Sequence, residues 1–258
     1  MTIKHIQAFA ITLLTIVSLA SCNKEIETAR VVNVAFHGYN LSDDQLEATF
    51  DTVVYDKDII QPNAQFNFSK VYPYFPGKGE LKVHVKNKAT GAEILQKTVS
   101  LSSGQLEFFF PLVYIDGKVL DVNPPQADPA TNKLGFYVYY PESSDPIDIF
   151  LYKAETGEQV YLAKNVVPGT WVSADYLPTP GFLNKSDIQQ CTVFFTKAGT
   201  NDQWAFNGDE YLSQTYVNSL YIPHMGYNLN KVQSYFITPS PQGYQTDVSN
   251  LFLSPKEY

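Results

Sequence analysis

Side chains suited to ligand binding gather in residues 201–210, which read Asn-Asp-Gln-Trp-Ala-Phe-Asn-Gly-Asp-Glu. The candidate set combines flat aromatic faces with amide and carboxylate oxygens: Trp204, Phe206, Asn207, Asp209 and the following Tyr211. A sugar ring has an apolar C–H face and a polar hydroxyl edge, so this mixture could hold a glycan. The same side chains are typical of protein interfaces or of a filled core. The sequence leaves these three alternatives open.

No catalytic motif accompanies these side chains. The sequence contains no Gly-x-Ser-x-Gly nucleophile elbow, no Walker loop and no dinucleotide fingerprint. Two carboxylates could hydrolyse a glycosidic bond if they met at roughly 5 to 9 Å, but nothing selects a pair among the 26 acids. We therefore expect a binding protein with no cofactor, and not an enzyme.

The histidines do not predict a metal site. His37, His84 and His224 are widely separated, and the sequence has no His-x-x-x-His or Cys-x-x-Cys spacing. His84 lies between Lys82 and Lys86 at alternate positions of an expected strand, where neighbouring cations would repel a metal ion. We expect no metal ligands.

The elements that must position the candidate side chains are predicted to be β-strands. Residues 81–86 alternate apolar and polar side chains, and residues 147–152 form a second strand-like run in the corresponding place. Each run is followed by a Thr-Gly turn and a returning strand, and Asp116-Gly117 is a strong hairpin signal. Short strands and frequent Pro and Gly turns indicate an all-β protein of tandem antiparallel β-sandwich modules.

The sequence also repeats itself weakly. Residues 45–56 align with 105–116 at an offset of 60, and Tyr74-Phe75-Pro76 aligns with Tyr139-Tyr140-Pro141 at an offset of 65. Because the order of the matches is preserved, we predict two related modules with a seam near residues 102–104. The modules resemble Ig-like or transthyretin-like β-sandwiches.

These matches divide the chain into five parts. We expect a signal peptide at 1–21, a tether at 22–29, a first module at 30–104, a second module at 105–170 and an aromatic-rich β region at 171–258. The last part is either a third domain or a set of strands that completes the second sandwich.

The first 21 residues have the layout of a secretory signal. Lys4 is the single charged residue among them, and an interrupted apolar run from residue 6 to 19 precedes small residues. A membrane-spanning helix needs roughly 20 apolar residues, and this run is shorter. A cleaved signal therefore fits better than a permanent transmembrane anchor.

The end of this run resembles a known processing site. Leu19-Ala20-Ser21-Cys22 resembles the lipobox of bacterial lipoprotein signals, which implies that Cys22 is acylated and becomes the first mature residue. Each buried CH₂ of an acyl chain stabilises membrane binding by ~0.8 kcal/mol, so two or more chains anchor stably. The charged residues 23–27 resemble the tether of surface-exported Bacteroidota lipoproteins, which implies a location on the outer membrane, facing outward.

Acylation would leave Cys191 as a lone cysteine, although a Cys22–Cys191 disulfide is the alternative that the count of two allows. Cys191 lies in an apolar, strand-like run, where a free cysteine behaves as a small hydrophobic residue. We therefore expect Cys191 in the core.

The charge balance excludes one class of partner. The chain has 18 Lys and Arg against 26 Asp and Glu, a net charge of −8. No basic cluster is present that could neutralise phosphates, so we expect no nucleic-acid partner.

We expect a non-catalytic surface lipoprotein. By analogy with surface lipoproteins that capture polysaccharide for uptake, the first hypothesis is a glycan-binding accessory protein. The alternative is a structural or adhesive lipoprotein, or a protein-partner subunit of a pilus-like or transporter complex at the outer membrane. A fold alone does not decide between them.

Overall fold

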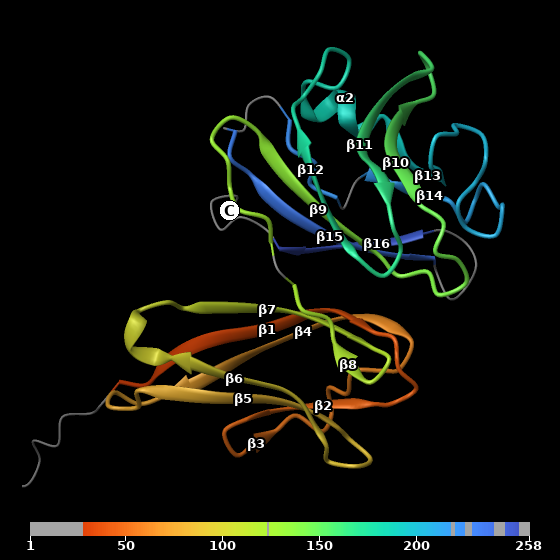
Figure 1. Ribbon diagram of the computed structural model, residues 1–258. Helices are drawn as coiled ribbons and strands as arrows, with labels where there is room; N and C mark the ends of the chain where they lie inside the picture. The colour runs from red at the N-terminus through yellow and green to blue at the C-terminus, as the bar shows by residue number, and fades with distance from the viewer. Residues whose placement is uncertain (1–27, 123, 218–219, 225–228, 240–245, 253–258) are drawn as a thin grey trace, which may run out of the picture.

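Two β-sandwiches follow one another along the chain (Figure 1). The structure, a computed structural model, describes residues 28–122, 124–217, 220–224, 229–239 and 246–252. Nearly all of its regular elements are strands, so the predicted all-β class is confirmed. The predicted signal peptide, Cys22 and the tether up to residue 27 lie outside the described residues.

The first sandwich contains eight strands and one short 3-10 helix. They are β1 (Arg30–Asn40), β2 (Leu46–Phe50), β3 (Val53–Val54), β4 (Ala64–Tyr74), β5 (Glu80–Asn87), β6 (Glu93–Ser100), η1 (Leu101–Ser103), β7 (Glu107–Ile115) and β8 (Lys118–Val119). One sheet has the order β4-β1-β7-β8 and the other β3-β2-β5-β6. Asp116 and Gly117 form the predicted turn between β7 and β8, with φ of 50° and 75°.

The second sandwich repeats this arrangement strand for strand. Its elements are β9 (Asn132–Val138), β10 (Ile147–Lys153), β11 (Glu158–Val166), β12 (Trp171–Tyr176), α2 (Lys185–Gln189), β13 (Cys191–Lys197), β14 (Gln214–Tyr216), β15 (Val232–Pro239) and β16 (Thr246–Phe252). The sheets have the orders β12-β9-β15-β16 and β11-β10-β13-β14. Each sandwich is antiparallel apart from one parallel pair, β1 with β7 and β9 with β15.

The repeat holds down to single buried positions. Ala48 lies opposite Val85 in the first sandwich, and Ile149 lies opposite Phe195 at the corresponding place in the second. All four side chains are at most 1% exposed. The strand register and the burial pattern therefore identify β2 with β10 and β5 with β13.

The chain does contain two related modules, but the sequence matches aligned strands that do not correspond to one another in the fold. The matches at offsets of 60 to 67 pair segments of β2 with β7 and of β5 with β10, which occupy different places in the fold. Short strands with apolar residues at alternate positions resemble one another wherever they lie in a sheet. A local pattern match therefore did not reveal the topological position.

The module boundaries shift accordingly. β7 lies in the sheet of the first sandwich, with Phe110 beside Phe36, so the seam predicted near residues 102–104 falls inside that sandwich. β12 and β15 flank β9, and β13 pairs with β10. The described residues after 170 therefore complete the second sandwich and do not form a third domain.

A close approach of β1 to β7 requires a glycine. Gly38 has φ of 147°, and a Cβ atom at this position would lie 2.2 Å from the carbonyl oxygen of Leu112. A side chain cannot be accommodated against a neighbouring backbone atom at that distance, so only glycine fits. Gly38 therefore permits the parallel pairing of β1 with β7.

The two sandwiches pack against each other through an aromatic interface. Tyr39 of β1 lies with its ring centroid 5.0 Å from that of Phe236 in β15, and Tyr137 stacks on Phe236 at 5.8 Å. Val113 and Ile115 of β7 join the same cluster. The Nε1 atom of Trp171 donates a hydrogen bond to the main-chain oxygen of Asp121 at 2.9 Å.

This interface makes a stack of four sheets. The sheets β4-β1-β7-β8 and β12-β9-β15-β16, which we call the inner sheets, face one another across the interface (Figure 1). The sheets β3-β2-β5-β6 and β11-β10-β13-β14, the outer sheets, lie at opposite ends. Each outer sheet therefore presents one face away from the rest of the protein.

Candidate functional site

The exposed face of the second outer sheet is aromatic. Ile149 and Leu151 point into the core, so the alternation of a strand directs Phe150 and Tyr152 of β10 outward. The neighbouring strands β11 and β13, and the residues that follow β13, add further rings. The aromatic face consists of Phe150, Tyr152, Tyr161, Phe194 and Trp204.

The five rings form a continuous surface. Phe194 is central, with ring centroids 5.8 Å from Phe150, 5.4 Å from Tyr152 and 5.3 Å from Trp204. Tyr161 lies 5.5 Å from Phe150. Phe150 is only 2% exposed because its neighbours cover it, whereas the other four rings are half-buried. A ligand would therefore meet four ring surfaces supported from below by Phe150.

Polar groups lie at the margin of this face. The hydroxyl of Tyr161 donates a hydrogen bond to Oδ1 of Asn201 at 2.7 Å. The Nζ atom of Lys164 lies 3.8 Å from the centroid of the Tyr161 ring, a cation–π contact. Gln214 lies opposite Phe194 on the neighbouring strand β14. The face thus combines apolar platforms with hydrogen-bonding side chains at its edge.

The same face of the first sandwich has a different chemistry. By strand register, Thr49 corresponds to Phe150 and His84 to Phe194. Glu47 lies opposite Lys86 there, and Nδ1 of His84 lies 2.8 Å from Oε2 of Glu93. A charged and hydrogen-bonded face therefore suffices for this topology, and the fold itself does not require the aromatic face of the second sandwich.

The structure places Trp204 in the aromatic face but not Phe206. Phe206 is fully buried and contacts Tyr140 and Phe195 in the core, with ring centroids 5.0 and 5.6 Å apart, so its assignment as a ligand-binding residue was wrong. Trp204 makes only an isolated bridge with Thr196, and the chain then bends inward. In a regular strand, Trp204 and Phe206 would lie on the same face because they are two residues apart. The strand geometry ends at Trp204, so Phe206 turns into the core.

The other predicted site residues shape a turn beside this face. Oδ1 of Asn207 accepts a hydrogen bond from the hydroxyl of Tyr140 at 2.8 Å, and Oδ1 of Asp209 accepts one from the main-chain N–H of Leu212 at 2.9 Å. Both side chains therefore make hydrogen bonds within the protein, one to a distant residue and one within the turn. Tyr211 is 72% exposed. The structure therefore brings Trp204 together with strand residues that the prediction did not include.

The sequence did contain a signal for these missed residues. Residues 147–152 are apolar at nearly every position, whereas a strand with one wet face should alternate. Phe194 and Phe195 similarly put aromatic rings on both faces of β13. In an antiparallel sandwich, such two-sided strands indicate an apolar outer face.

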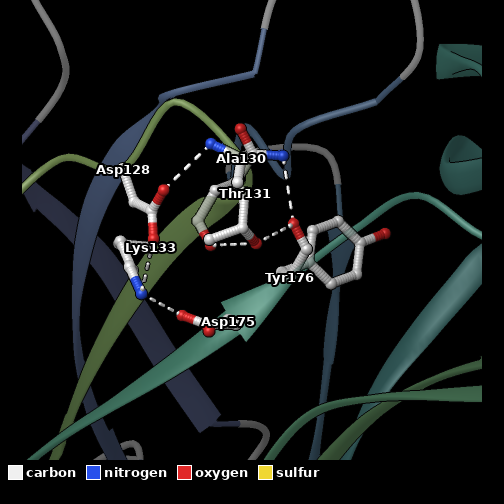
Figure 2. Close-up of polar contacts among 7 residues, drawn as sticks. Asp128, Ala130, Thr131, Lys133, Asp175 and Tyr176 are labelled. Carbon is white, nitrogen blue, oxygen red and sulfur yellow. Dashed lines mark hydrogen bonds and ion pairs between the residues drawn. The ribbon is translucent and has the colours of Figure 1, made fainter.

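Charged side chains elsewhere in the second sandwich engage one another. Figure 2 shows Nζ of Lys133 between two carboxylates, 2.5 Å from Oδ1 of Asp175 and 3.5 Å from Oδ2 of Asp128. The hydrogen bond with Asp175 raises the pKa of Lys133. The two ion pairs of Lys133 fasten the start of β9 to the end of β12.

Cys191 occupies the core position that the sequence predicted. It is 5% exposed, forms no disulfide with any described residue, and its Sγ atom donates to the main-chain oxygen of Asp187 at 3.3 Å. Burial raises the pKa of the thiol, which disfavours the reactive thiolate. Cys191 is therefore a packing residue in this fold.

Among the described residues, no three His, Cys, Asp or Glu side chains lie close enough together to hold a metal ion. Within the same ranges, no helix is long and apolar enough to cross a membrane.

Comparisons with known proteins give only remote likeness. No protein-family model and no curated protein matches the chain. A solved structure of the Bacillus anthracis TIE protein is 6% identical over 85% of this chain and 34% of that chain, with a TM-score of 0.22. A family CBM26 module from Eubacterium rectale Amy13K, solved with maltoheptaose, is 12% identical over 89% of this chain and all of that chain, also with a TM-score of 0.22. Overlaps this low carry no argument about function.

Proposed function

We propose that this protein is a non-catalytic binding protein whose aromatic face binds a glycan. The observation that carries the proposal is the continuous set of half-buried rings around Phe194, which the corresponding face of the first sandwich lacks. Partly exposed aromatic rings with a polar margin match a sugar ring, which offers C–H groups on its face and hydroxyls at its edge. Asn201, Gln214 and Lys164 supply that margin.

A lipid anchor would determine the location of the protein. We propose that Cys22 is acylated, as the lipobox resemblance implies, and that it anchors the chain to the outer membrane with the sandwiches outside the cell. The described chain enters the first sandwich at the start of β1, and the aromatic face lies at the far end of the stack of sheets. In this arrangement the face points away from the anchor toward soluble or cell-wall polysaccharide.

Affinity electrophoresis tests the proposal. The mature protein is run in native gels that contain soluble polysaccharides of different linkage and charge, and we expect at least one polysaccharide to retard it. A Trp204→Ala variant should lose most of that retardation. The absence of retardation by every polysaccharide in a broad panel would contradict the proposal.

A second candidate function has its own structural support. The inner sheet of the first sandwich and the residues at the ends of its strands expose large apolar side chains: Val31 (52%), Val71 (61%), Phe75 (59%), Leu106 (66%) and Phe109 (51%). Val31 lies opposite Pro73, and Phe109 beside Ala35, on neighbouring strands of this sheet. Apolar residues that gather in this way are typical of protein-binding surfaces, which favours a role as a partner subunit of a surface complex.

A further inference from the structure

The outer edge of β4 is a long main-chain surface. β4 runs over eleven residues, Ala64–Tyr74, and pairs with β1 on one side. Within the described part of the chain, no strand pairs with its other side, so β4 ends the inner sheet. An edge strand presents N–H and C=O groups in the pattern that a further strand would need.

The register identifies the groups that point outward. The main-chain N–H of Asn33 donates to Leu106 and that of Leu41 to Tyr114, both at 2.8 Å, so odd-numbered residues of β1 point their main chain at β7. Even-numbered residues then point at β4, where Phe36 lies opposite Phe68. The outward main-chain groups of β4 therefore belong to Gln65, Asn67, Ser69 and Val71, the odd-numbered residues.

Pro73 falls on the same outward side. A proline in a sheet is tolerated where its missing N–H would face away from the partner strand. Its position confirms the direction deduced from the register, and it also ends the stretch that can donate hydrogen bonds. The available edge is therefore about seven residues long, from Gln65 to Val71.

A groove follows this edge. Ala64 to Lys70 form one wall, residues 58–61 form the other, and the free volume between them is about 380 Å³. The second wall is fixed in place, because Ile60 exchanges two main-chain hydrogen bonds with Leu46, at 2.9 and 3.0 Å. Ile60 and Phe68 put apolar atoms into the groove. The groove thus has the elements of a slot for one extended chain.

β4 lacks the usual protection of an edge strand. Natural sheet edges carry charges, prolines or bulges that prevent pairing with other chains. Residues 64–69 are uncharged and contain no proline, and the β1–β4 register has no bulge. The one cation, Lys70, pairs with Asp58 at 2.7 Å and lies over the rings of Tyr55 and Phe68. The edge is therefore open to strand addition.

We propose that β4 accepts an extended, uncharged peptide segment of a partner protein as an added strand in this groove. The chemistry of the occupant follows from the lining, whose single acid and single base neutralise each other. Alternate side chains of the peptide would pack toward Phe66 and Phe68, while its main chain pairs with the odd-numbered residues. This inference is independent of the proposed glycan site, which lies on the other sandwich.

A second copy of this chain fits the groove less well than a peptide. The loop at residues 58–61 stands beside the edge of β4. Pairing the β4 strands of two copies would bring both loops into the same slot. A single extended segment has no such loop, so we take a peptide as the occupant.

Amide hydrogen exchange, followed by NMR on the mature chain, tests the proposal. In the free protein, the outward amides of Gln65, Asn67 and Ser69 should exchange rapidly, whereas Phe66 and Phe68, bonded to β1, should be protected. The probe is a capped peptide of alternating threonine and valine, about seven residues long to match the open edge. At saturation we expect at least about tenfold slower exchange at Asn67 and Ser69, since each new hydrogen bond removes an exchangeable donor from water.

Two controls isolate main-chain pairing. The same peptide, N-methylated at alternate residues, keeps its side chains but loses donors, and it should give no protection. Asn67→Pro removes one outward donor and should weaken binding about tenfold, whereas Asn67→Ala, which keeps the donor, should bind like the wild type.

Four outcomes would overturn the proposal. These are protection of the outward amides in free, dilute protein, protection that grows with protein concentration without peptide, equal protection by the methylated peptide, and protection by polysaccharide alone. The second outcome would assign the edge to another copy of this chain, and the last would assign the groove to a glycan.

Discussion

The ring of Phe194 lies 5.3 Å from that of Trp204, and the position of Phe194 in the first sandwich is taken by His84. His84 bonds to Glu93 on a charged face, whereas Phe194 forms the centre of an aromatic one. Since both faces belong to the same topology, the difference between them reflects something other than folding. This contrast supports a binding role for the second outer sheet.

Truncation of Trp204 should reduce glycan binding. We expect Trp204→Ala to weaken binding of any retarding polysaccharide at least about tenfold, because loss of an aromatic contact residue costs more than ~1 kcal/mol at most binding hot spots. Affinity electrophoresis measures this change. Phe75→Ala is the matched control, because Phe75 is an exposed aromatic residue on the other sandwich. Equal loss in both variants would show that the aromatic face is not the site.

Gly38→Ala should destabilise the first sandwich. A Cβ atom there would lie 2.2 Å from the oxygen of Leu112, so β1 and β7 must separate. We expect a loss of about 3 kcal/mol or more in the free energy of unfolding, measured in urea, since overpacking and backbone strain add. Gly91→Ala is the control: its φ is +70° but no atom lies within 4 Å of the added Cβ, so it should cost about 1 kcal/mol. Similar losses in the two variants would argue against the close approach.

Tyr176 should make the second sandwich sensitive to alkali. Burial raises the pKa of this 2% exposed phenol from 10.0 to about 12. The unfolded chain ionises near pH 10 while the folded one does not, so stability is fully present below pH 10 and falls between pH 10 and 12. The stability lost over this range amounts to about 3 kcal/mol.

Tyr176→Phe isolates this effect. Among the described residues, the Tyr176 hydroxyl has no hydrogen-bond partner, so its removal should change stability little at pH 7. The variant should lose less stability than the wild type between pH 10 and 12, as followed by urea unfolding at each pH. Parallel curves for the two proteins would show that Tyr176 ionises normally in the folded state.

Phe236 should couple the two sandwiches. Its ring is fully buried between Tyr39 of the first sandwich and Tyr137 of the second. Phe236→Ala should cost about 3 to 5 kcal/mol and separate the unfolding of the sandwiches into two calorimetric transitions. Phe75→Ala, at an exposed position, should change stability by less than about 0.5 kcal/mol. A single transition in the Phe236 variant would indicate that other contacts keep the sandwiches coupled.

Local strand patterns were sufficient to predict the elements but not their partners. The alternation at residues 81–86 and the Asp116-Gly117 turn predicted β5 and the β7–β8 hairpin correctly. The pairing of β7 with β1 depends on contacts between residues more than 70 positions apart, such as Phe36 and Phe110. No short-range pattern encodes such a contact, so the seam between the modules was placed too early.

The candidate site, too, depends on long-range contacts that local sequence patterns do not encode. Trp204 was predicted from composition and lies in the aromatic face, but Phe206, two residues later, fills the core. The bend between them is set by tertiary contacts, among them the hydrogen bond from the main-chain N–H of Phe206 to Oγ of Ser213 at 2.9 Å. Phe150 and Phe194 come from separate strands, so only their pairing in the sheet brings them together.

The most direct test of the central claim follows the emission of Trp204 during a glycan titration. Trp171→Phe leaves Trp204 as the single tryptophan of the chain, and the retarding polysaccharide is added to this variant. If the aromatic face binds the glycan, Trp204 emission should change with saturation at the same concentration that retards the protein in gels. Retardation without any change in Trp204 emission would contradict the assignment of the glycan site to this face.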